Sequence, residues 1–188
     1  MKVKKFVLIV LLLSFCFSYS QVTNEGNPKS WDLNLSTDIE EKILPPFDIQ
    51  SLKDEDSQNE GKSGIPWRFG YSHTVDYGFD DGQWTILENG DRIWRILISS
   101  PGAISLNFIF DDFYMPKGGS LYLYSDDKSD LLGAYTSVQN QDSGMLGTWL
   151  VYGEKVWLEY YEPAEVIGEG RLHLSNITHG YRLSLIHI

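Results

Sequence analysis

The serine residues of this 188-residue sequence are the first candidates for chemistry, because a serine hydroxyl can act as a nucleophile. Only Ser143, in the tripeptide Asp142-Ser143-Gly144, has a neighbourhood that suggests a nucleophile loop. Serine catalysis also needs a histidine base and an acid that orients it. The tripeptide lies in a polar stretch, VQNQDSGMLG, without the flanking glycines of a trypsin-like nucleophile loop. We therefore expect Ser143 to be a turn residue.

Histidines and paired carboxylates are the next candidates, as metal ligands. His73, His173, His179 and His187 have none of the spacings found in metal-binding motifs, so structural roles are expected for them. A loop with several carboxylates can hold Ca²⁺. The acidic pairs are Asp80-Asp81, Asp111-Asp112 and Asp126-Asp127, the last followed by Asp130. Their spacing matches no calcium loop, which favours solvated turns, with a structural Ca²⁺ as the alternative and no other cofactor.

Three glutamates complete the survey of catalytic types. Two of Glu88, Glu159 and Glu162 could act as the paired carboxylates of a glycosidase. The sequence does not determine the distance between their carboxyl groups that this chemistry requires. The single cysteine, Cys16, lies near the N-terminus. Beyond it the sequence contains no disulfide, no thiol nucleophile and no cysteine ligand for zinc or iron–sulfur centres. The sequence therefore predicts no catalytic residue and no metal ligand.

The first 20 residues are typical of a secretory signal peptide. Lys2, Lys4 and Lys5 precede the apolar run 6–17, and small residues lead to Ser20 and Gln21, between which cleavage is expected. A membrane anchor needs about 20 apolar residues, and a lipoprotein signal acylated at Cys16 would place a small residue before it, where Phe15 stands. The mature protein is therefore expected outside the cytoplasm, in the periplasm or the extracellular space, and not in a membrane.

The charge of the remaining chain restricts its partners. Without the three leader lysines it carries 12 basic and 26 acidic side chains, a net charge of −14. Nucleic acids and anionic membranes attract dense clusters of lysine and arginine. The sequence therefore argues against both as partners.

The elements that position these residues follow an all-β pattern from residue 65 onward. Runs of apolar and aromatic residues alternate with polar ones and are separated by turn residues every 8–12 positions. Strands are expected at 67–75, 83–88, 92–99, 103–110, 120–125, 131–137, 147–152 and 155–161, with a ninth at 170–177. Asn89-Gly90 indicates a hairpin with a type I′ turn. The prediction is an antiparallel β-sandwich, jelly-roll-like, with about 8–9 strands and no parallel sheet.

The segment 21–64 is polar and expected to be only partly helical. Thr37 and Glu40 have the spacing of a capping box, and a second helix is expected to start at Asp48. A solvated acidic linker is the alternative for residues 48–64.

Aromatic residues provide the only candidate binding surface. Trp94 and Trp149 are expected in the core, whereas Trp157 and Tyr161 lie on the opposite face of their strand from Val156. An outward aromatic face would bind a sugar ring or a protein partner. Trp157 and Tyr161 are therefore the candidate partner-facing residues.

Several short motifs, in this order and spacing, resemble the N-terminal pro-region of secreted bacterial trypsin-like serine proteases of the lysyl endopeptidase type. The resemblance spans about residues 42–182 and rests on PPFD at 45–48, ED at 55–56, PWRFG at 66–70, WRI at 94–96, SPGA at 100–103, FDDFYMP at 110–116, GSLYLY at 119–124, GAYT at 133–136, EYYEP at 159–163 and HGYR at 179–182. It implies a folded pro-domain, residues 65–182, that assists folding of a following catalytic domain and inhibits it until cleavage.

The resemblance also implies what the partner is. The protease catalytic domain would lie in cis beyond residue 182, so the full-length protein would be a serine endopeptidase although this chain carries no catalytic residues. Residues 183–188, LSLIHI, depart from the family pattern and are interpreted as the non-native tail of a truncated fragment. For a protease that cleaves after lysine, Lys53 and Lys62 are the candidate processing sites. The alternative function is a stand-alone secreted binding module for carbohydrate or a cell surface, with Trp157 and Tyr161 as its platform.

Overall fold

Alternating apolar and polar residues produce eleven strands in the computed structural model, which describes residues 24–182. The strands are β1 (Glu41–Ile43), β2 (Gly70–Tyr77), β3 (Gln83–Ile86), β4 (Arg92–Ser99), β5 (Ser105–Tyr114), β6 (Ser120–Ser125), β7 (Leu131–Tyr135), β8 (Leu146–Gly147), β9 (Val151–Tyr152), β10 (Lys155–Glu162) and β11 (Arg171–Gly180). Two α-helices, α2 (Lys29–Asp32) and α3 (Ile49–Asn59), and two 3₁₀ turns, Ser137–Gln139 and Ala164–Val166, complete the described part. The predicted strands are confirmed within a few residues, with the seventh divided into β8 and β9.

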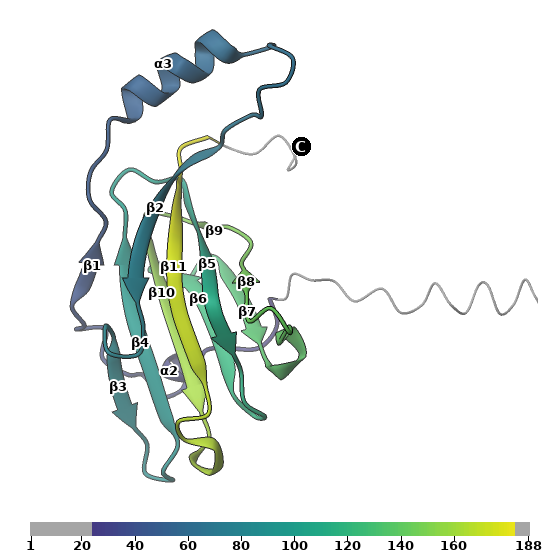
Figure 1. Ribbon diagram of the computed structural model, residues 1–188. Coiled ribbons are helices and arrows are strands. Elements are labelled where there is room, and N and C mark those ends of the chain that lie inside the picture. The colour runs from purple at the N-terminus through teal and green to yellow at the C-terminus, as the bar shows by residue number, and fades with distance from the viewer. Residues whose placement is uncertain (1–23, 183–188) are drawn as a thin grey trace, which may run out of the picture.

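The strands form two stacked sheets (Figure 1). The first sheet has the order β1-β4-β10-β6-β7, with β3 also beside β4, and the second has the order β2-β11-β5-β8, with β9 also beside β5. The pairs β2–β11, β4–β10, β5–β8/β9 and β6–β7 are nested, as in one long antiparallel ribbon folded over on itself. This winding is that of a jelly roll, so the predicted sandwich and its jelly-roll character are confirmed.

The core lies between the two sheets. Every second side chain of a strand points inward. Among these side chains, Ile96, Phe108 and Leu158 are at most 1% exposed. Trp94 belongs to this core at 2% exposure, as expected. Trp149 does not: it is 41% exposed, because residues 148–150 lie in the irregular link between β8 and β9.

The hairpin between β3 and β4 forms where Asn89-Gly90 indicates it, but with a different turn. Gly90 has φ 88°, whereas Asn89 is not among the residues with positive φ. The Gly90 N–H donates to the Leu87 carbonyl at 3.0 Å, and the Leu87 N–H donates to the Asp91 carbonyl at 2.8 Å. This is a type I turn followed by a glycine bulge, and the type I′ prediction is wrong.

The N-terminal segment, residues 24–44, packs against the outer face of the first sheet. Its strand β1 pairs with β4 in parallel, a pair that the sequence did not predict and that makes this sheet mixed. The helix expected at Thr37–Glu40 does not form, because this stretch leads directly into β1. The helix expected from Asp48 is confirmed as α3, where the Asp48 carboxylate accepts a hydrogen bond from the Ser51 N–H at 3.0 Å.

Helix α3 lies at one end of the sandwich, beside the end of β11 (Figure 1). Within residues 24–182, no helix has both the length and the apolar character needed to cross a membrane.

Candidate functional site

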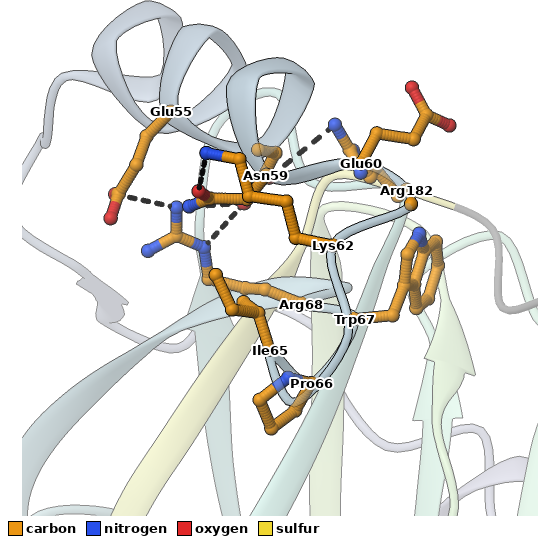
Figure 2. A pocket seen from close by; sticks show the side chains of 11 residues that line it. Glu55, Asn59, Glu60, Lys62, Ile65, Pro66, Trp67, Arg68 and Arg182 are labelled. Carbon is orange, nitrogen blue, oxygen red and sulfur yellow. Dashed lines mark hydrogen bonds and ion pairs between the residues drawn. The ribbon is translucent and has the colours of Figure 1, made fainter.

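The α3 end of the sandwich contains a hollow of about 380 Å³. Three pieces of chain that are distant in sequence form it: α3, the irregular stretch 60–69, and Arg182 just after β11 (Figure 2). Residues 60–67 are all exposed, and the stretch 60–69 contains no strand or helix. The hollow therefore has one helical wall, α3, and one wall of irregular chain.

Asp56 is the central group that holds α3 in place. Its side chain is 8% exposed and accepts hydrogen bonds from Arg68 Nε at 2.9 Å and from the Tyr181 hydroxyl at 2.7 Å. The Arg182 guanidinium lies 3.5 Å away. Burial acts to raise the pKa of Asp56, but the hydrogen bonds from Tyr181 and Arg68 and the two positive charges outweigh it, so the pKa is lower than usual. Arg68 is further fixed by the Glu55 carboxylate at 2.8 Å.

The rim of the hollow is apolar. Ile65 is 48% exposed and Trp67 is 43% exposed. The Arg182 guanidinium lies 5.9 Å from the centre of the Trp67 ring, close enough for a cation–π interaction. Trp67 and Arg182 are of the residue types that are enriched at protein–protein interfaces.

The two lysines predicted as processing sites are both near this end but in different settings. Lys53 lies within α3, where its carbonyl accepts a hydrogen bond from the Ser57 hydroxyl at 2.8 Å. Lys62 lies in the exposed stretch and its ammonium donates to the Asn59 side chain at 3.1 Å. Ser20 and Gln21, the predicted leader cleavage site, lie outside the described residues, as does His187.

The predicted aromatic platform is not an open surface. Trp157 does point away from the inter-sheet core, but it is 2% exposed, because the N-terminal segment covers it. Tyr161 is half-buried, and its hydroxyl donates to Asp91 at 2.5 Å. The expectation that Trp157 faces a partner is therefore corrected: on this strand the outward side chain is covered by the protein's own chain.

The acidic turns use their carboxylates internally. Asp127 accepts hydrogen bonds from the hydroxyls of Ser125 and Ser129, which lower its pKa to about 2. Asp130 accepts from the Tyr152 N–H at 2.8 Å, and Asp111 contacts His173. Residues 24–182 contain no cluster of three or more histidine, cysteine or acidic side chains arranged to hold a metal ion.

The residues weighed for catalysis each bond to neighbouring groups of the protein. Ser143 is exposed in a turn, where its hydroxyl accepts from the Met145 N–H at 3.3 Å. Glu159 and Glu162 are each 1% exposed and bind groups of the protein itself, Tyr124 and Tyr160 among them.

Sequence reasoning missed one polar cluster, at the α3 end between the sheets. Ser100 Oγ lies 2.7 Å from His179 Nδ1, and both residues are at most 3% exposed. The Phe47 ring packs edge-on against His179 and against His73. Ser100, His179 and Phe47 are among the residues that line a separate hollow of about 270 Å³. Burial of the His73 and His179 imidazoles lowers their pKa values. The separation of Ser100 and His179 by 79 positions left no local signal in the sequence.

No family model matches the chain, and no solved structure matches it.

Proposed function

We propose that this protein is the non-catalytic pro-domain of a secreted trypsin-like serine protease of the lysyl endopeptidase type, which assists folding of the protease and inhibits it until cleavage. The arrangement at the α3 end supports this proposal. Arg182 follows the end of β11 and lines the hollow. A catalytic domain that follows residue 182 would therefore begin next to the exposed side chains of Ile65 and Trp67. The hollow and its rim are then the surface that the protease would contact.

Such a pro-domain would act by mass action. A partner that binds only the native protease stabilises it, and a covalent link keeps the local concentration of that partner high. The charge of −14 beyond the leader favours encounter with a basic surface, or with a pocket selective for lysine. Secretion to the periplasm or the cell exterior after signal-peptide cleavage belongs to the same proposal.

Processing by a lysine-directed protease would be easier at Lys62 than at Lys53. A protease binds its substrate in an extended form, and residues 60–67 are exposed without regular structure. Cleavage after Lys53 would first require α3 to unwind. Mapping of the new termini that the mature protease produces tests whether processing occurs after Lys62. If neither Lys62 nor Lys53 is cleaved, the proposed processing sites are wrong.

The test of the main proposal is inhibition in trans. The chain without its leader is added to an active lysine-cleaving, trypsin-like protease domain of this type, and both inhibition and the refolding yield of the denatured protease are measured. We expect inhibition and a higher yield, with both reduced by Trp67→Ala. Ile86→Ala is the matched control, because Ile86 is 78% exposed on β3, away from the hollow. Absence of both effects with the unchanged chain would contradict the proposal.

The alternative, a stand-alone binding module for carbohydrate or a cell surface, loses the platform on which it was based, because Trp157 is covered. Its test remains simple. Retarded migration of the chain in gels that contain polysaccharide, without any protease present, would favour the module over the pro-domain.

A further inference from the structure

A second hollow, of about 160 Å³, lies under the N-terminal segment on the outer face of the first sheet. One wall consists of residues from the N-terminal segment, among them Ser30 and Trp31. The other wall comes from the sheet side and consists of Arg95, Tyr124, Asp126, Lys128 and Trp157. Any molecule in this hollow would contact both the segment and the sheet.

Arg95 is the unusual group in this hollow. It is 4% exposed, its Nε–H has no hydrogen-bond acceptor, and it takes part in none of the ion pairs within residues 24–182. Its guanidinium lies 5.8 Å from the centre of the Trp157 ring. A buried guanidinium N–H without an acceptor is costly, because it loses its hydration without a replacement.

The two carboxylates nearby, Glu159 and Asp126, accept hydrogen bonds from groups other than Arg95. Glu159, the partner of Arg95 on the neighbouring strand, accepts from the Ser30 N–H at 2.9 Å and from the Tyr124 hydroxyl at 3.2 Å. Asp126 accepts from the Trp157 indole N–H at 2.8 Å. The carboxylates of this region therefore hold the N-terminal segment and the sheet in place.

The donors, in contrast, are in excess. The Trp31 indole N–H is buried without an acceptor among the described residues. Lys128 has φ 62°, a backbone conformation that is unfavourable for a lysine, and its ammonium lies 5.2 Å from the Trp31 ring centre. Arg95 and Trp31 thus each bring one buried N–H without an acceptor to this small hollow, and the exposed Lys128 adds a second positive charge at its wall.

We propose that this hollow binds a small oxyanion, a carboxylate, sulfate or phosphate group, with Arg95 as its main ligand and Trp31 and Lys128 as supporting donors. Hydrogen bonds between guanidinium and oxyanion are charge-assisted and strong, and Arg can make two at once. Because the ligand would contact both walls, its binding would stabilise the packing of the N-terminal segment on the first sheet. The site does not depend on the pro-domain proposal.

The test uses the full chain without its leader. The midpoint of thermal unfolding is measured in sodium acetate, sulfate, phosphate and chloride at constant ionic strength and pH. We expect at least one oxyanion to raise the midpoint above that in chloride, and titration calorimetry with that anion to show saturable binding. A response to acetate alone identifies a carboxylate, and a response to sulfate or phosphate identifies a tetrahedral anion.

Two variants separate the site from general salt effects, since sulfate strengthens apolar burial in any protein. Arg95→Met keeps the length of the side chain and removes a buried charge, so it should fold and should weaken anion binding at least tenfold. Lys128→Gln should weaken binding less, and Lys117→Gln, an exposed lysine in another turn, should leave it unchanged. The proposal is overturned if no oxyanion binds, or if folded Arg95→Met binds it as well as the unchanged chain.

Discussion

The two faces of the first sheet are both buried, but they are built differently. The inward face belongs to an apolar core, in which Ile96 and Leu158 are at most 1% exposed. The outward face carries aromatic rings together with Arg95 and Glu159, which are 4% and 1% exposed. The inward face is buried by the second sheet, and the outward face is buried by residues 24–44.

This difference shows that a polar residue in an alternating strand is not necessarily exposed. On β10 the alternation places Val156 inward and Glu159 outward, as the period of a strand requires. Yet Glu159 is buried, because the N-terminal segment bonds to it through the Ser30 N–H. The packing of the inward face depends on the shape and the buried area of apolar side chains. The packing of the outward face depends in addition on specific hydrogen bonds.

The largest effect is expected in the apolar core. Phe108→Ala should lower the free energy of unfolding by about 3–5 kcal/mol, because Phe108 is fully buried and its removal leaves a cavity between the sheets. Urea denaturation measures this loss. Ile86→Ala, at a residue that is 78% exposed, is the control and should change stability little. Equal losses in the two variants would show that the inter-sheet packing is not as described.

A smaller and local effect is expected on the outward face. Trp31→Ala should cost about 2 kcal/mol, because the half-buried Trp31 ring packs edge-on against Tyr124 with 5.0 Å between centres. Hydrogen exchange should speed up in residues 24–44 while the inter-sheet core stays protected. Trp67→Ala, at a residue that is 43% exposed at the other site, should leave this exchange unchanged. Loss of protection throughout the sandwich would mean that both faces form one cooperative unit.

The polar contacts of the outward face can be tested separately from its apolar area. Tyr124→Phe removes one hydroxyl, which donates to Glu159 and lies 3.2 Å from the Ser30 hydroxyl. We expect a loss of about 1–2 kcal/mol in urea denaturation, because a buried carboxylate loses a partner. Tyr114→Phe, on the exposed part of β5, is the matched control. If the two variants lose the same amount, the hydrogen bonds of the outward face do not determine its stability.

The same contrast explains what the sequence could predict. Period-2 alternation is a local signal, so the strands, the Asn89-Gly90 hairpin position and the jelly-roll class followed from it. Helix α2 has four residues and packs on the first sheet, and β1 has three residues and pairs with β4 within that sheet. Such elements leave no periodic pattern to detect.

The candidate site was predictable only in part. Lys53 and Lys62 were named as processing sites through the resemblance and stay predictions; Lys53 lies in α3 and Lys62 in the irregular stretch 60–69. Asp56 and Tyr181 are 125 positions apart, and their hydrogen bond forms only because β11 ends beside α3. Trp157 was predicted on the correct face of its strand but with the wrong exposure, since the covering segment comes from residues more than 100 positions earlier.

The smallest effect concerns pH, at the α3 end, where polar residues do enter the inter-sheet core. Burial lowers the pKa values of His73 and His179, and no acceptor or donor within residues 24–182 pairs with the Nε2 atom of either ring. Below the unfolded pKa of about 6.5, the unfolded chain binds more protons than the folded chain. Stability should therefore decrease as pH falls from 6.5 towards the lowered folded pKa values.

His173, on the outer face of the second sheet, should act in the opposite sense and in a different pH range. Hydrogen bonds to Asp76 and Asp111 raise its pKa, so its contribution is present below pH 6.5 and is lost as pH rises through the raised value. Thermal unfolding across pH 5–8 tests both. His73→Leu should reduce the loss on the acid side, and His173→Gln should remove the decline on the alkaline side. If His73→Leu loses as much stability below pH 6.5 as the unchanged chain, protonation of the buried histidines is not the cause of that loss. The α3 end of the core would then respond to pH no more than its apolar part.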